Sequence, residues 1–120
     1  IEDIVVDPLA MPIGADHTLA MKTMEAIHLI STEIGVNTTL GASNVSFGMP
    51  DRHTLNAVFL PMAMKAGLTS AIMDARTPQI VTAVKGADLM MGNDEWGANW
   101  IAAHRAKQAA AQAAEAAAQA

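Results

Sequence analysis

Short apolar runs, each followed by a longer stretch with helical periodicity, recur three times along the chain. The first run, Ile4–Val6, stops at the Asp7-Pro8 pair because proline cannot donate to a strand ladder. The next two runs cover Thr38–Gly41 and Ser70–Met73. Short, continuous apolar runs are typical of strands in a parallel sheet whose two faces are both covered. We therefore expect three buried parallel strands.

Segments of helical periodicity follow the first two runs. The first helix is expected at about 17–34, where Asp16 can cap the start and Gly35 can end the helix in a left-handed conformation. The second is expected at 52–66 and contains Pro61, which cannot donate to a carbonyl one turn earlier and should kink the helix. The apolar side chains expected to face the core are Ala20, Met24, Ile27 and Ile34, then Leu55, Val58, Phe59 and Met62.

A third helix is expected from Thr77-Pro78 to about Leu89, because a capping residue followed by proline is a strong helix start. Strands that alternate with helices in this way indicate an α/β fold, with a parallel sheet and right-handed crossovers. Three parallel strands cannot close a barrel. Either further residues or another copy of the chain would have to complete one.

The pattern changes after Gly92. Asn93 and Asp94 can cap a last helix, and from residue 106 the sequence is nearly all alanine and glutamine. Such a tail has high helix propensity but little to bury, so we expect it to be helical and frayed or disordered. We therefore divide the chain into a folded part, 1–105, and a tail, 106–120. The last helix should hold Trp96, Trp100 and Ile101.

The composition argues against several classes of function. A formal net charge of -5 with seven Lys and Arg residues disfavours a nucleic-acid surface. The absence of cysteine removes disulfides, thiolate catalysis and cysteine metal sites. The sequence has no secretory signal and no run close to the roughly 20 apolar residues that cross a bilayer, so we expect a cytoplasmic protein with no membrane partner. The chain starts without methionine on a strand-like run, which suggests a piece of a longer protein.

Three polar residues come at or just beyond the ends of the expected strands: Asp7, Asn44 and Asp74. Each alone has an ordinary explanation as a loop-forming or capping residue. In a parallel sheet, however, all three would meet at the carboxyl edge, where α/β proteins bind ligands. A carboxylate together with an amide suits the polar edge of a heterocycle. Asn44 lies in a loop, 41–50, that is unusually rich in small and amide side chains.

Metal-binding and common catalytic motifs are not visible in the sequence. The four histidines have neither the i, i+4 spacing of two ligands on one helix face nor a carboxylate pattern around them, so we expect no metal site. No Ser-His-acid order, P-loop or dinucleotide-binding glycine pattern is present.

Four segments together resemble the last three βα units of the pterin-binding barrel. They are Ile4–Leu9, Gly41–Gly48, Phe59–Leu68 and Ala71–Asp74, and the Asp-Pro-Leu and Ser-Asn-Val-Ser stretches are the most specific. That barrel occurs in methyltetrahydrofolate:corrinoid-protein methyltransferases, in the folate domain of cobalamin-dependent methionine synthase and, more distantly, in dihydropteroate synthase. The resemblance covers about 3–105. It implies the C-terminal part of a (β/α)8 TIM barrel, three parallel βα units followed by a C-terminal helix.

The resemblance also implies roles for individual residues. Asp7 corresponds to the aspartate that hydrogen-bonds the pterin ring, and Asn44 to the asparagine close to N5, the atom that gives up the methyl group. Asn44 is thus the expected catalytic residue, and Arg52 is expected to meet the aminobenzoyl-glutamate portion of the folate. The remaining expected substrate-binding residues are Ser43, Ser46 and Asp74.

The implied reaction is methyl transfer from N5-methyltetrahydrofolate to a cobalt(I) corrinoid that a partner protein, not this chain, carries. The N-terminal strands of the barrel are absent from these 120 residues, so the chain holds part of a site. Pro61 departs from the family, in which a small helix former is common at that position.

Two other interpretations remain open. In the first, the chain is a catalytically silent half-barrel that pairs its open sheet edges with a second copy, since an unpaired apolar edge is an aggregation template. In the second it is a dihydropteroate synthase. That enzyme's relatives carry a lysine in the loop that corresponds to Ser43–Ser46, and this sequence has none there.

Overall fold

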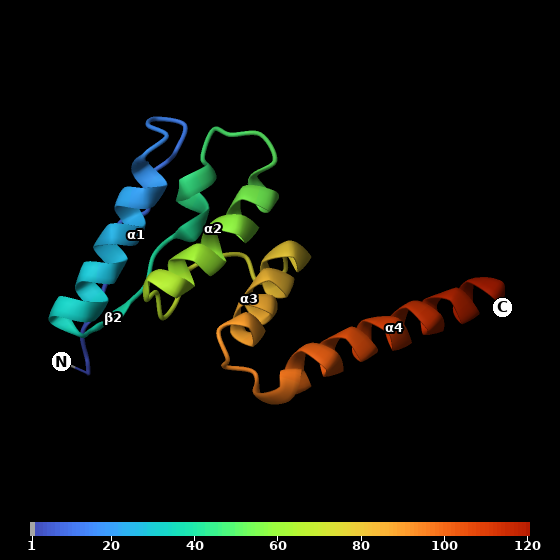
Figure 1. The fold of residues 1–120 in the computed structure, drawn as a ribbon. Helices are drawn as coiled ribbons and strands as arrows, with labels where there is room; N and C mark the ends of the chain where they lie inside the picture. Colours follow the sequence, from blue (N-terminus) through green and yellow to red (C-terminus); the bar gives the residue numbers. More distant parts are fainter. Residues whose placement is uncertain (1) are drawn as a thin grey trace. The chain divides into compact units, whose positions relative to one another are not determined.

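A computed structural model describes residues 2–120, which form two compact units (Figure 1). The first ends at Val84 and the second is Lys85–Ala120. The boundary between the units falls inside a helix, α3 (Pro78–Met90).

The first unit contains a small parallel sheet. β1 (Val5–Val6) pairs with β2 (Asn37–Thr38) in parallel. Beyond β2, an isolated parallel bridge joins Gly41 to Ile72, and the Ile72 N–H donates to the Leu40 carbonyl at 2.8 Å. Three chain segments therefore lie side by side in sequence order with the same direction, as the alternation of runs and helices predicts.

The expectation of three buried strands is wrong in extent and in burial. The segment 70–73 contributes only the bridge at Ile72, and β2 ends at Thr38 rather than Gly41. Val5 in β1 is 55% exposed and Ile72 is 68% exposed. Successive strand side chains point to opposite faces, and the first unit covers only the face that carries Thr38 and Leu40. Val5 and Ile72 belong to the uncovered face.

The first helix begins and ends close to the expected positions. α1 (Leu19–Leu29) continues as a π-helix, η1 (Ile30–Ile34), and Gly35 ends it with φ 76°. Met24 and Ile27 are buried as expected, but Ile34 is 59% exposed. The wider π-turn changes the phase of the helix, so a residue two turns after Ile27 no longer faces the core.

The second helix buries a different stripe from the one predicted. α2 (Arg52–Ala66) starts after Asp51 as expected and continues as one helix through Pro61. Of the expected core positions only Phe59 is buried, whereas Val58 and Met62 are exposed. Apolar residues occur all round this helix, so periodicity alone does not select the buried face. The buried residues are Asn56, Phe59, Leu60 and Ala63.

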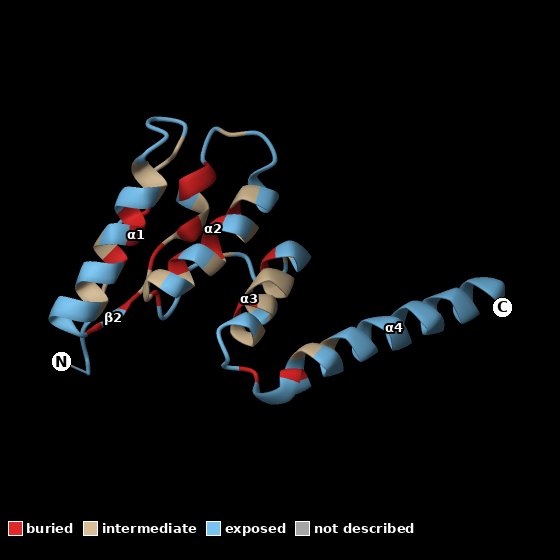
Figure 2. Ribbon diagram, in the orientation of Figure 1, coloured by how far each residue is buried: buried red, intermediate tan, exposed pale blue. Residues whose placement is uncertain are grey.

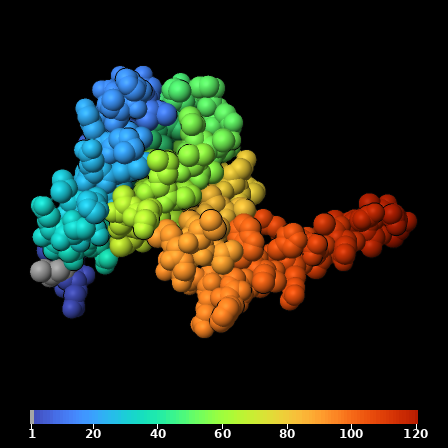
Figure 3. Space-filling view, viewed as in Figure 1, coloured from blue at the N-terminus to red at the C-terminus, as the bar shows by residue number. Residues whose placement is uncertain are grey.

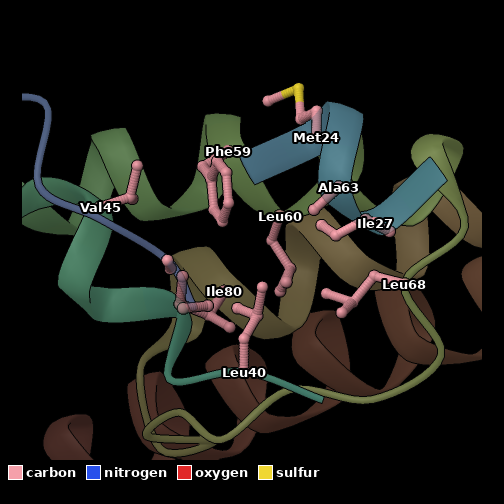
Figure 4. Close-up of a cluster of buried hydrophobic side chains, with 11 residues drawn as sticks. Met24, Ile27, Leu40, Val45, Phe59, Leu60, Ala63, Leu68 and Ile80 are labelled. Atoms are coloured by element: carbon pink, nitrogen blue, oxygen red, sulfur yellow. The ribbon is translucent and has the colours of Figure 1, made fainter. Parts of the chain in front are cut away.

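The hydrophobic core of the first unit lies where α1, α2 and the strand segments meet. α1 and α2 lie side by side, and their buried residues face each other across the core (Figures 1 and 2). Figure 4 shows Leu40 of the strand region beneath Leu60, with Ile80 of α3 beside it. Each fully buried Leu or Ile contributes about 1.5–3 kcal/mol to stability. This core fixes the loops at the carboxyl ends of the strands.

The second unit consists of the end of α3, a 3-10 turn, η3 (Glu95–Gly97), and α4 (Ala98–Gln119). Asp94 caps α4 as expected: its Oδ1 accepts from the Asn99 N–H at 3.0 Å and its Oδ2 from the Trp100 N–H at 2.9 Å. No residue of α4 is buried, and its alanine-rich end, which Figure 1 draws as one helix, is coloured red in Figure 3. The division of the chain at residue 105 stays a prediction.

None of the helices in the described part of the chain is both long enough and apolar enough to cross a membrane. The cytoplasmic location stays a prediction.

Candidate functional site

Asn44 lies in a short 3-10 turn, η2 (Ala42–Ser46), directly after the Gly41 bridge. The turn is closed by backbone hydrogen bonds from the Asn44 N–H to the Gly41 carbonyl at 3.1 Å and from the Phe47 N–H to the Asn44 carbonyl at 3.2 Å. Its neighbours Val45 and Ser46 are buried, but Asn44 itself is exposed. Within residues 2–120 the Asn44 carboxamide has no hydrogen-bond partner. The turn therefore presents a free amide to solvent.

A network of polar side chains holds this turn on the start of α2. The Ser46 hydroxyl, fully buried, donates to Asn56 Oδ1 at 2.6 Å. Asn56 Nδ2 in turn donates to Ser43 Oγ at 3.3 Å. Ser43 and Ser46, on either side of Asn44, are thus both tied to one buried amide.

Arg52 is bound to the same turn. Its Nε donates to Ser46 Oγ at 3.1 Å, and its Nη2 donates to the Ser43 carbonyl at 2.8 Å and to Ser43 Oγ at 2.9 Å. The guanidinium carbon lies 5.8 Å from the centroid of the Phe47 ring, within the range of a cation–π contact. In the described residues no carboxylate pairs with Arg52. Its positive charge remains uncompensated at the edge of the loop.

Asp7 follows β1 in the neighbouring loop. Its Oδ1 accepts a hydrogen bond from the Leu9 N–H at 2.8 Å, and Leu9 has a left-handed φ of 62°. The Ile13 N–H then donates to the Val45 carbonyl at 3.0 Å, which joins this loop to η2. The loops that carry Asp7 and Asn44 thus lie side by side at the carboxyl edge of the parallel strands.

Asp74, the third expected rim residue, is engaged by Arg76. Arg76 Nε donates to Asp74 Oδ1 at 2.9 Å and its Nη2 to Oδ2 at 3.1 Å. These bonds, and a further one from the Arg76 N–H, lower the pKa of the Asp74 carboxyl, with a smaller contribution from His53. The Asp74 carbonyl accepts from the Thr77 N–H at 3.2 Å just before α3. Both carboxylate oxygens therefore have a local partner.

Two contributors to this region were not expected from the sequence: Asn56 and Arg76. Asn56 stands one turn after Arg52 and one turn before Leu60, on the stripe of α2 that is buried. A polar residue within an apolar stripe needs a hydrogen-bond partner, because an unpaired buried amide costs about 1–3 kcal/mol. The sequence thus indicates that Asn56 needs a hydrogen-bond partner, but it does not identify Ser43 and Ser46 as the partners.

The described residues include no group of three or more His, Cys, Asp or Glu side chains that could hold a metal ion. The polar groups at this rim are instead a carboxylate, which accepts hydrogen bonds, a guanidinium, which donates them, and a free carboxamide, which can do both. They suit an organic ligand with both donor and acceptor groups at its edge.

Comparison with known proteins points to one family. Residues 1–74 match the family described as pterin binding enzyme. A methylcorrinoid:tetrahydrofolate methyltransferase of Eubacterium limosum is 32% identical over 94 residues, which cover 76% of this chain and 34% of that protein. The methionine synthase of Mycobacterium tuberculosis is 40% identical over 79 residues, 60% of this chain and 7% of that protein. The chain thus spans about a third of the first relative and a small part of the second.

Proposed function

This chain belongs to the family of pterin-binding enzymes, and we propose on that basis that it supplies part of a pterin site. The reaction we propose is transfer of a methyl group from N5-methyltetrahydrofolate to a cobalt(I) corrinoid on a partner protein or domain. The observation that carries the proposal is the hydrogen bond between Ile13 and Val45, which joins the Asp7 loop to the Asn44 turn. Since the chain spans about a third of the first relative, other parts of the full-length protein are expected to complete the site.

Asp7 and Asn44 suit two different parts of the proposed substrate, the amide-like edge of the pterin and the N5 atom. The Asp7 carboxylate is exposed and only its Oδ1 is used within the loop, so Oδ2 is available to accept from the amide-like edge of a pterin. The Asn44 carboxamide can donate to a ring nitrogen or accept from it. Asp7 would therefore orient the ring and Asn44 would act at N5.

The chemical difficulty lies in the leaving group. When the bond between N5 and the methyl carbon breaks, its electron pair stays on N5, and an amine nitrogen carries that charge poorly. A hydrogen bond donated by Asn44 would stabilise the developing charge until N5 takes a proton from water. An amide does this without titrating, so its contribution should not depend on pH.

The corrinoid lies outside this chain in our proposal. Reduced cobalt on the partner would supply the nucleophile that accepts the methyl group. The relative from Eubacterium limosum is named for transfer from methylcorrinoid to tetrahydrofolate. The same contacts to N5 serve the reaction in either direction, because forward and reverse transfer pass through the same transition state.

Calorimetric titration of the full-length protein with N5-methyltetrahydrofolate tests the proposal. We expect saturable binding with one site per chain, and methyl transfer when reduced corrinoid protein is added. A protein that binds no folate and transfers no methyl group contradicts the proposed function.

Exposed apolar residues support a second candidate. Val5 and Ile72 on the open face of the strands are more than half exposed. A second copy of the chain could cover this face, and the chain would then act as a self-associating half-barrel without catalysis. Sedimentation of the 120-residue chain separates the two: a dimer without folate binding supports this candidate, and a stable monomer contradicts it.

A further inference from the structure

The turn that carries Asn44 is held on both sides by α2. We propose that Asn56 and Arg52 are positioning residues, which fix the Asn44 carboxamide through Ser43 and Ser46 rather than by contact with the substrate. This inference rests on the proposed function, because it concerns how Asn44 is aimed at N5.

Asn56 is the buried centre of the arrangement. It is 5% exposed, Ser46 is fully buried, and the bond between them is the shortest in the network at 2.6 Å. If Asn56 were apolar, the Ser46 hydroxyl would lose its shorter hydrogen bond and keep only the Ser43 carbonyl at 3.2 Å as an acceptor, and Ser43 Oγ would lose the amide donor. Since Ser43 and Ser46 flank Asn44, the turn would be held less tightly on both sides of that residue.

Arg52 holds the same two serines from the exposed side. Its planar fork places Nε on Ser46 and Nη2 on Ser43, and the guanidinium carbon lies over the Phe47 ring, 5.8 Å from its centroid. A lysine at this position would keep the charge but could not reproduce two donors at fixed separation. Arg52→Lys therefore distinguishes two roles. Bracing, by which we mean holding the Asn44 turn through Ser43 and Ser46, needs the fork of the guanidinium, whereas attraction of an anionic substrate needs only the positive charge.

The kinetic test compares Arg52→Lys and Asn56→Leu with a matched control in the full-length protein. The control, Thr23→Val, removes a buried polar group as Asn56→Leu does, but that group is a hydroxyl on α1 that donates to the Leu19 carbonyl. Each is assayed with N5-methyltetrahydrofolate and with a methylated tetrahydropterin that lacks the aminobenzoyl-glutamate tail.

If Asn56 and Arg52 brace the turn, both variants should lower kcat about 10- to 100-fold with either substrate, and KM should change little. Displacement of a catalytic group by about 1 Å has an effect of this size. Thr23→Val should keep its kcat. A rise in KM confined to the substrate with the glutamate tail would overturn the proposal, since it would show that Arg52 binds that tail. A kcat of Arg52→Lys and Asn56→Leu equal to that of Thr23→Val would also overturn the proposal.

Hydrogen exchange provides a readout that does not depend on activity. The amide protons of Phe47 and Met49 are bonded to the Asn44 and Ser46 carbonyls, so they report on the turn directly. Arg52→Lys and Asn56→Leu should speed their exchange about tenfold or more, while the amides of α1 keep their rates. Unchanged exchange at both positions overturns the bracing role even if the protein is an active methyltransferase. Faster exchange in a protein that transfers no methyl group supports bracing and contradicts only the proposed function.

Discussion

The backbone N–H of Ile13 donates a hydrogen bond to the carbonyl of Val45 at 3.0 Å. These residues belong to the loops that follow β1 and β2, and Val45 is the residue next to Asn44. The loop after β1 begins with Asp7. The parallel pairing of β1 with β2, together with this backbone bond, thus places the loops that carry Asp7 and Asn44 at the same edge of the strands.

Replacement of Asp7 by asparagine should weaken pterin binding without disturbing the fold. The amide oxygen of the new side chain would still accept from the Leu9 N–H, so the loop keeps its shape, but the negative charge is lost. A hydrogen bond to a charged group contributes about 1 kcal/mol more than a neutral one, so Kd for N5-methyltetrahydrofolate should rise about 5- to 10-fold. Calorimetry measures this directly. Asp3→Asn, at another exposed aspartate just before β1, is the control, and an equal Kd in both variants would contradict the role of Asp7.

The Asp94 cap should stabilise the start of α4. Asp94→Ala removes the acceptors of the Asn99 and Trp100 amides, and loss of such a cap costs about 0.5–2 kcal/mol. Hydrogen exchange at these two amides should accelerate accordingly. The neighbouring Glu95→Ala is a suitable control, because Glu95 is exposed and caps no amide of α4. Identical protection in both variants would show that the cap contributes nothing.

The Asp74–Arg76 pair gives a prediction about pH. Hydrogen bonds from Arg76 lower the pKa of the Asp74 carboxyl below its ordinary value of 3.8. A carboxyl whose pKa is lower in the folded state contributes stability above its unfolded-state pKa, and loses it as the pH falls through the folded-state value. Both side chains are exposed, so the contribution to stability is small and the titration itself is the better measurement.

Arg76→Gln should therefore raise the pKa of Asp74 towards 3.8, as followed by NMR of the carboxyl carbon. Lys22→Gln serves as the control, since Lys22 contributes, after the hydrogen bonds from Thr18, to the lowered pKa of Asp16 and not to that of Asp74. A midpoint for Asp74 that stays the same in Arg76→Gln would mean that the pair does not form in solution.

Features set by local chemistry could be predicted from the sequence. Gly35 ends the first helix because its left-handed φ is favourable only for glycine, and Asp94 caps the last helix because its short carboxylate reaches the first-turn amides. The common edge of Asp7 and Asn44 followed from strand order alone, since the carboxyl ends of parallel strands meet.

Features that depend on partners distant in sequence could not be predicted. The buried stripe of α2 excludes Val58 and Met62 because the neighbours of the helix, not its period, decide which face is covered. The segment 70–73 forms a single bridge at Ile72 because no further strand pairs with it among the described residues. Asn56 was missed for the same reason, since its partners Ser43 and Ser46 lie in a different loop.

Asn44→Ala in the full-length protein tests the central claim most directly, with methyl transfer to reduced corrinoid protein measured in single turnovers and folate Kd measured by calorimetry. If Asn44 stabilises charge on N5, the transfer rate should fall about 100-fold or more while Kd changes by less than about threefold. Asn37→Ala, at an exposed asparagine of β2, should leave both quantities unchanged. Equal losses in rate and in affinity, or no loss of either, would contradict the role assigned to Asn44.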